Sequence, residues 1–133
     1  GFLYAVLDSD DSRHQEVVEV LSSLVKNEII LLVPVVVETA YLLLSRIGHH
    51  AVRDFIKVLE SGRFTLQCVK QDDISRISEE LEEYSDANLD FTDAAITALA
   101  ERLRIEQILT VDQKDFRMIV PKHCDYFEIF PPE

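Results

Sequence analysis

Three aspartates stand where the side chains of an α/β protein can meet a ligand. Asp93 lies at the start of a helix rich in small residues, and Asp112 and Asp115 follow a short apolar run that reads as a strand. In an open α/β sheet, ligands bind outside the carboxyl ends of the strands. Carboxylates that converge there repel one another unless a divalent cation lies between them. The pattern therefore predicts a site for a hard cation such as Mg²⁺ or Mn²⁺.

Glu38 is a fourth candidate ligand, and it stands in a different context. It lies within residues 35–44, a segment that is apolar on most faces, and no basic residue is three or four positions away to pair with it. Burying an unpaired carboxylate in such a segment is costly, which favours a metal-binding role. The alternative is that Glu38 reaches solvent along a narrow polar edge.

Helix capping offers a different explanation for the aspartates. With Asp90 as N-cap, Asp93 would be the third helical residue of a variant capping box and would favour the helix dipole without any chemistry. Asp112 and Asp115 are also three residues apart and precede a short predicted helix. Asp86 belongs to the same acidic segment as Asp90 and is a further candidate. Spacing alone does not separate capping from metal binding.

Helices and short apolar strands alternate along the whole chain, which implies a parallel sheet covered on both faces. Strands are expected over residues 29–33, 64–68, 107–111 and 126–130. Helices are expected over residues 2–7, from Pro34 to about Arg46, over 51–60 and over about 72–84, with further helices around 17–25 and after Asp90. We therefore expect a single domain over residues 1–133 with a three-layer α/β/α architecture around a central, mainly parallel sheet.

Apolar residues at helical spacing predict which helix faces lie in the core. The expected inward residues are Val17, Leu21, Leu24 and Val25; then Val52, Phe55, Ile56 and Leu59; and then Ile74, Ile77, Leu81 and Tyr84. Glu79, Glu80, Glu82 and Glu83 fall mostly outside the last stripe and are expected to form a solvated face.

Two acidic segments, residues 84–94 and 109–116, resemble those of the PIN-domain nucleases, especially the VapC-type toxins. Residues 1–5 resemble the start of that family's first helix, and residues 33–38 resemble the helix that bears its second acidic residue. Each motif is short, but the four follow the family's order over nearly the whole chain.

The resemblance implies a PIN-like fold and hydrolysis of RNA phosphodiester bonds with Mg²⁺ or Mn²⁺. Glu38, Asp93 and Asp112 would be the catalytic metal ligands, and Asp115 would be a further ligand. The family's first strand, which ends in its first acidic residue, would lie just before Gly1. The resemblance also implies a small antitoxin as partner, a homodimer and a cytoplasmic location.

The net charge of −12 argues against RNA as a substrate, because it disfavours binding to a polyanion. Five basic residues could still form a local phosphate-binding face, bind an acidic partner or simply be solvated: Arg13, Arg46, Arg53, Lys57 and Arg63. Two cysteines form no disulfide framework or zinc motif, so a reducing cytoplasm is the default. No apolar run approaches the ~20 residues of a membrane span.

Two alternatives to a nuclease remain open at this stage. One is a PIN-like domain without catalysis that serves as a binding or assembly module, which the acidic balance and the missing first aspartate would suit. The other is a phosphoacceptor receiver domain, which also gathers aspartates at strand ends. A receiver would place a lysine just after the last or penultimate strand, whereas the strand ending at Val111 leads to Asp112.

Overall fold

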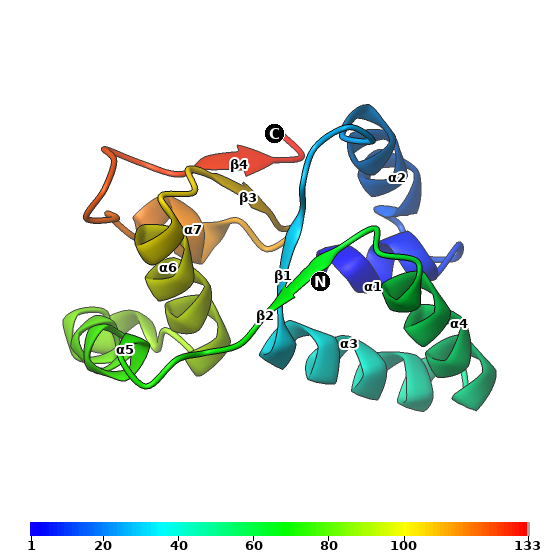
Figure 1. The fold of residues 1–133 in the computed structure, drawn as a ribbon, viewed down its shortest axis with the longest axis horizontal. Coiled ribbons are helices and arrows are strands. Elements are labelled where there is room, and N and C mark those ends of the chain that lie inside the picture. The colour runs from blue at the N-terminus through cyan, green and yellow to red at the C-terminus, as the bar shows by residue number, and fades with distance from the viewer. Residues whose placement is uncertain (133) are drawn as a thin grey trace. The chain divides into compact units, whose positions relative to one another are not determined.

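The structure is a computed structural model that describes residues 1–132, and these residues form two compact units. The first unit spans Gly1–Cys68, and the second begins at Val69. Each unit combines helices with one pair of parallel strands (Figure 1). The parallel α/β organisation expected from the sequence is therefore confirmed, whereas the single domain over residues 1–133 stays a prediction.

The first unit is built around the parallel pair β1 and β2. Its elements are α1 (Phe2–Leu7), α2 (His14–Ser23), β1 (Ile30–Leu32), α3 (Val33–Arg46), α4 (His49–Glu60) and β2 (Thr65–Gln67). Leu31 of β1 lies opposite Leu66 of β2. Strand β1 runs directly into α3 because Pro34, in the first turn, needs no backbone N–H donor there. The two helices α3 and α4 make the crossover between the strands.

Gly48 separates α3 from α4. Its φ of +145° lies in a region that L side chains rarely adopt, so glycine is the suitable residue at this turn. The backbone N–H groups of Ile47 and Gly48 both donate to the carbonyl of Leu43 and complete the end of α3. Helix α4 then begins at His49, slightly earlier than the predicted Ala51.

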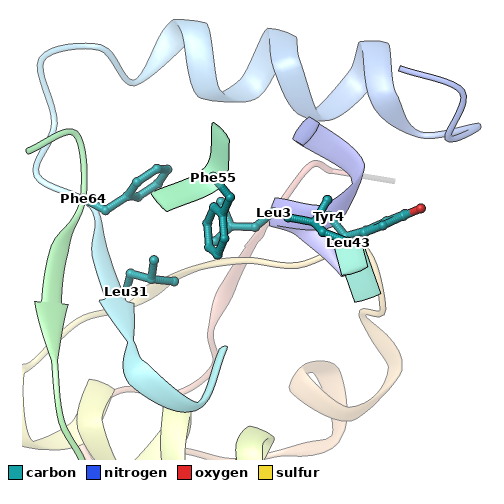
Figure 2. Close-up of a cluster of buried hydrophobic side chains, with 6 residues drawn as sticks. All are labelled: Leu3, Tyr4, Leu31, Leu43, Phe55 and Phe64. Atoms are coloured by element: carbon teal, nitrogen blue, oxygen red, sulfur yellow. The ribbon is translucent and has the colours of Figure 1, made fainter. Parts of the chain in front are cut away.

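Phe55 of α4 is central to the core of the first unit, where its side chain is fully buried. Around it lie side chains from α1, β1, α3 and the segment before β2, as Figure 2 shows: Leu3, Tyr4, Leu31, Leu43 and Phe64. Burial of this cluster holds the helices against the strand pair, because moving one apolar side chain out of water stabilises the folded state by about 1.5–3 kcal/mol.

The prediction was wrong for three of the residues expected to face the core. Val25 is 70% exposed because α2 ends at Ser23 and the chain has already turned away. Ile56 is 48% exposed and Ile74 43% exposed. Both flank their helix's apolar stripe, and the neighbouring elements cover only its centre, at Phe55 and Ile77.

The second unit contains α5 (Asp73–Glu83), the 3-10 helix η1 (Ser85–Ala87), α6 (Phe91–Leu103), β3 (Gln107–Leu109), α7 (Lys114–Met118) and β4 (Glu128–Phe130). Strands β3 and β4 are parallel, with Ile108 opposite Ile129. Helix α6 buries a face of small residues that includes Ala94, Ala95 and Ala98, and small side chains allow close approach by a neighbouring element. Helices α5 and α6 pack against each other.

Two bidentate ion pairs join α5 to α6. Arg76 donates to both carboxylate oxygens of Glu101 at 2.8 and 3.1 Å, and Arg102 donates to both oxygens of Asp73 at 3.0 and 3.2 Å. These groups are mostly buried, where paired charges interact more strongly than they do at the surface. The pairs fix the register between the two helices.

Glu80 of α5 corrects the expectation of a solvated glutamate face. Its side chain is completely buried, and neither carboxyl oxygen has a hydrogen-bond partner among the described residues. Burial raises the pKa of Glu80 to about 8, and this effect outweighs the attraction of Arg76, whose Nε lies 3.3 Å from Glu80 Oε1. Arg76 is also engaged by Glu101, so its charge is shared.

None of the helices within residues 1–132 combines the length and apolar character needed to cross a membrane.

Replacing Phe55 by alanine is expected to destabilise the protein by about 3–5 kcal/mol, because it leaves a cavity in a fully buried cluster. Urea denaturation followed by circular dichroism measures the loss. Ile56→Ala is the matched control, since this half-exposed neighbour should cost less than about 1 kcal/mol. Equal losses in the two variants would contradict the described packing of α4.

Replacing Glu80 by glutamine is expected to flatten the dependence of stability on pH. An unfolded glutamate ionises near pH 4.3, whereas Glu80 in the folded chain ionises at about 8, so stability falls as the pH rises between these values. The slope contributed by one such group is up to about 1.4 kcal/mol per pH unit. Urea denaturation at pH 5, 6.5 and 8 should show a smaller decline for Glu80→Gln than for the wild type, with exposed Glu82→Gln behaving as the wild type.

Candidate active site

The start of α6 positions Asp93. Asp90 is the N-cap of this helix, and its side chain accepts a hydrogen bond of 2.9 Å from the backbone N–H of Asp93. The capping role expected for Asp90 is therefore confirmed. One turn further on, the hydroxyl of Thr97 is buried and donates to the backbone carbonyl of Asp93. The backbone of Asp93 is thus held on both sides, while its carboxyl group is left to interact with other side chains.

The carboxyl group of Asp93 is half-buried among other aspartates. The pKa of Asp93 is raised to about 7, and burial is the largest cause. The smaller causes, in decreasing order, are the negative charge of Asp90, a side-chain hydrogen bond with Asp115, and the charges of Asp115 and Asp112. We call these four residues, Asp90, Asp93, Asp112 and Asp115, the aspartate cluster. Like charges in a partly desolvated place disfavour ionisation, which is the physical cause of the shift.

The turn after β3 brings Asp112 and Asp115 to this place. Thr110 extends the β3–β4 ladder by donating to the carbonyl of Phe130, and its hydroxyl donates to the carbonyl of Asp112 at 3.0 Å. The buried side chain of Gln113 donates to the backbone carbonyl of Pro131, which ties the turn to the segment after β4. Asp112 remains exposed, whereas Asp115 is half-buried in the first turn of α7.

Capping does not account for Asp112. The N-cap of α7 is Gln113, and no side chain caps this helix by a hydrogen bond. The capping explanation considered for Asp112 was therefore wrong, and the exposed carboxylate is left without that structural role. The sequence predicts only a capping role for Asp90, but its charge also raises the pKa of Asp93. The spacing of three residues at the start of a helix is the sequence signal for both effects.

Glu38 lies in α3 of the first unit and is exposed. The expectation of a buried carboxylate was wrong, because the segment around it is not covered on all faces: Val37, Tyr41 and Leu44 are also more than half exposed. The alternative that Glu38 reaches solvent is the one observed. Exposure is compatible with a ligand role, and that role stays a prediction.

Asp86 is exposed and lies in η1. The residues that dominate the pKa of Asp93 are Asp90, Asp115 and Asp112, and Asp86 is not one of them. The structure thus gathers three of the predicted aspartates with Asp90 and gives Asp86 no part in the cluster.

The donor chemistry of the aspartate cluster fits a hard divalent cation. Within residues 1–132, no three histidine, cysteine, aspartate or glutamate side chains form a ready-made metal site. Carboxylate oxygens are nevertheless the ligands that Mg²⁺ prefers, and a cation would offset the repulsion that raises the pKa of Asp93. Asp93, Asp112 and Asp115 are the residues of this unit that could hold the ion.

Comparison with known proteins identifies the family. The sequence model of the PIN domain matches residues 1–119, which is most of the chain. The chain belongs to the PIN-domain family. This membership confirms the resemblance seen in the sequence, and the receiver-domain alternative was wrong.

A curated relative and a solved structure carry the comparison further. This PIN-domain chain is 28% identical over 130 residues to Ribonuclease VapC26 of Mycobacterium tuberculosis, covering 97% of this chain and 95% of the relative. It also resembles the crystal structure of VapC20 from Mycobacterium tuberculosis, described as a toxin that cleaves the sarcin-ricin loop, with a TM-score of 0.75 and 23% identity. That match covers 86% of this chain and 88% of VapC20, so the fold is that of a VapC-type PIN domain.

Replacing Asp90 by alanine is expected to cost about 1 kcal/mol of stability, because α6 loses its side-chain N-cap. It should also lower the pKa of Asp93, since one of the charges that raise this pKa is removed. Thermal unfolding at pH 6 measures the first effect, and carboxyl-detected NMR titration measures the second. Asp86→Ala is the control, and a similar pKa shift in both variants would contradict the described cluster.

Proposed function

We propose that this PIN-domain chain is a Mg²⁺- or Mn²⁺-dependent endoribonuclease and the toxin of a toxin–antitoxin pair. The observation that carries the proposal is the aspartate cluster at the start of α6, where the pKa of Asp93 is raised to about 7 by burial and neighbouring carboxylates. Membership of the PIN family and similarity to a ribonuclease over nearly the whole chain support the same conclusion.

Glu38, Asp93 and Asp112 are the proposed catalytic metal ligands, and Asp115 is a further one. A bound divalent ion would activate a water molecule and stabilise the charge that develops on the phosphate. Asp93 is the residue that must give up its proton as it becomes a ligand, because its pKa of about 7 leaves it partly protonated at neutral pH. Asp90 holds the backbone of Asp93 in place, and exposed Asp112 is accessible to a ligand from solvent.

The chain itself need not supply a covalent nucleophile. Burial raises the pKa of the Cys124 thiol, which keeps it protonated and a poor nucleophile. Cys68 is exposed and carries no disulfide. Hydrolysis by activated water is therefore the chemistry that these residues suit best.

The proposal extends to the partners and the location of the protein. We expect a small antitoxin that blocks the acidic residues with a basic segment, and a homodimer. The exposed apolar stripe of Val37, Tyr41 and Leu44 on α3 is a candidate for either contact, because a stripe of this kind is usually covered by a partner. Two cysteines without a disulfide suit a cytoplasmic location.

Cleavage of mixed RNA by the freshly isolated, partner-free protein, with its natural N-terminus, tests the proposal. Cleavage should require Mg²⁺ or Mn²⁺ and should stop when a chelator is added. Glu38→Gln should lower the rate by more than about 100-fold without unfolding the protein, since Glu38 is exposed and contributes little to the core. The matched control is Glu19→Gln, another exposed helical glutamate, which should retain full activity.

Replacing Asp93 by asparagine separates catalysis from folding. The variant should remain folded, because its backbone hydrogen bonds are unchanged and the repulsion within the aspartate cluster is relieved. Its RNA cleavage should fall by more than about 100-fold. A folded and fully active Asp93→Asn protein would overturn the assignment.

A binding or assembly module without catalysis is the second candidate. It is favoured by one observation, that no ready-made group of three ligands lies within the described residues. Partner-free protein that fails to cleave RNA with either metal ion would support this module over the nuclease.

A further inference from the structure

Three of the five basic residues considered as a phosphate-binding face are engaged by the protein itself. Arg13 pairs with Glu16 at 2.6 Å. Arg46 lies over the ring of Tyr4, 5.0 Å from its centroid. Arg63 donates to three backbone carbonyls at and after the end of α2. All three side chains already contact groups of the first unit, which limits their freedom to bind a ligand.

Arg53 and Lys57 are different, because both are exposed on α4 and neither forms an ion pair within the described residues. The guanidinium of Arg53 instead lies 2.6 Å from Nδ1 of His49, one turn earlier. We call His49, Arg53 and Lys57 the basic stripe. Its residues recur every four positions, and Phe55 on another face of the helix points into the core.

The absence of acidic partners is notable in a chain with a net charge of −12. Asp54 and Glu60 belong to the same helix, yet no ion pair joins either of them to the stripe in residues 1–132. The first turn of α4 contains no acidic residue and has no side-chain cap. Lys57 lies in the last turn of α4, where a cation suits the helix dipole, and Arg53 lies one turn before it.

We propose that the basic stripe binds the phosphates of single-stranded RNA and so helps to hold the substrate of this enzyme. This inference rests on the proposed ribonuclease function. Side chains four apart on a helix are about 5–6 Å from each other at Cβ, which lets Arg53 and Lys57 reach successive phosphates of one strand. The planar guanidinium of Arg53, oriented by His49, can donate two parallel hydrogen bonds to one phosphate.

Charge balance favours RNA as the occupant over an acidic protein. A chain of net charge −12 repels a polyanion over most of its surface, so its substrate needs a local attractive face. Phosphates repeat at regular intervals along RNA and match the row that Arg53 and Lys57 form, one helical turn apart. Binding to the row releases counterions from the RNA, which makes the interaction strongly dependent on salt.

Binding of a fluorescein-labelled 20-nucleotide single-stranded RNA, measured by anisotropy in the presence of chelator, tests the inference without cleavage. The double variant Arg53→Gln/Lys57→Gln should bind about 10-fold or more weakly near 100 mM salt. The slope of log affinity against log salt should be smaller by about 1.4, since two phosphate contacts are lost. The charge-preserving variant Arg53→Lys/Lys57→Arg should restore most of the affinity.

The matched control is Lys26→Gln/Lys70→Gln, which removes the same charge from exposed positions elsewhere. It should bind RNA nearly as the wild type does. The inference is overturned if the wild type and the stripe variant bind RNA equally, or if the control variant binds as weakly as the stripe variant. In the first case, the occupant of the stripe would be an acidic protein or a second copy of the chain. The nuclease proposal is judged separately, by metal-dependent cleavage of RNA by the wild type.

Discussion

The hydrogen bond from the backbone of Asp93 to the side chain of Asp90 is the contact on which the site depends. It starts α6 at a defined residue and places a second carboxyl group beside the cap. The buried alanine face of α6 then fixes the helix within the second unit. Asp93 is therefore held half-buried by the fold itself, where other aspartates disfavour its ionisation. A carboxylate poised in this way gains from a cation more than a solvated one does.

Most of the arginines described in this chain make structural contacts. In the second unit, arginines are used to join helices, as Arg76 does with Glu101 and Arg102 with Asp73. In the first unit, Arg63 satisfies the carbonyls at the end of α2. A protein with 13 basic and 25 acidic residues has few cations to spare, and most of those described have structural contacts. Arg53 and Lys57 form no ion pair within the described residues and stand one helical turn apart on the exposed side of α4.

Glu80 shows how a structural carboxylate can be confused with a candidate metal ligand. Both Glu80 and Asp93 have raised pKa values, and burial is the largest cause for each. The second cause differs: Arg76 lowers the pKa of Glu80, whereas Asp90 raises that of Asp93. Glu80 therefore belongs to the packing of α5, and Asp93 to a gathering of like charges that suits a cation. A raised pKa alone would not have distinguished the two.

The sequence by itself determined the order of the elements, the family and the candidate carboxylates. These depend on local signals, such as the cap at Asp90, the glycine at Gly48 and Pro34 after a strand, which act over a few residues whatever surrounds them. Only the tertiary structure decided which side chains are buried. Ile56 is exposed and Glu80 is enclosed because burial depends on the element packed opposite, which helical periodicity does not specify. The pKa of Asp93 likewise depends on Asp112 and Asp115, which the chain brings near only by folding through β3.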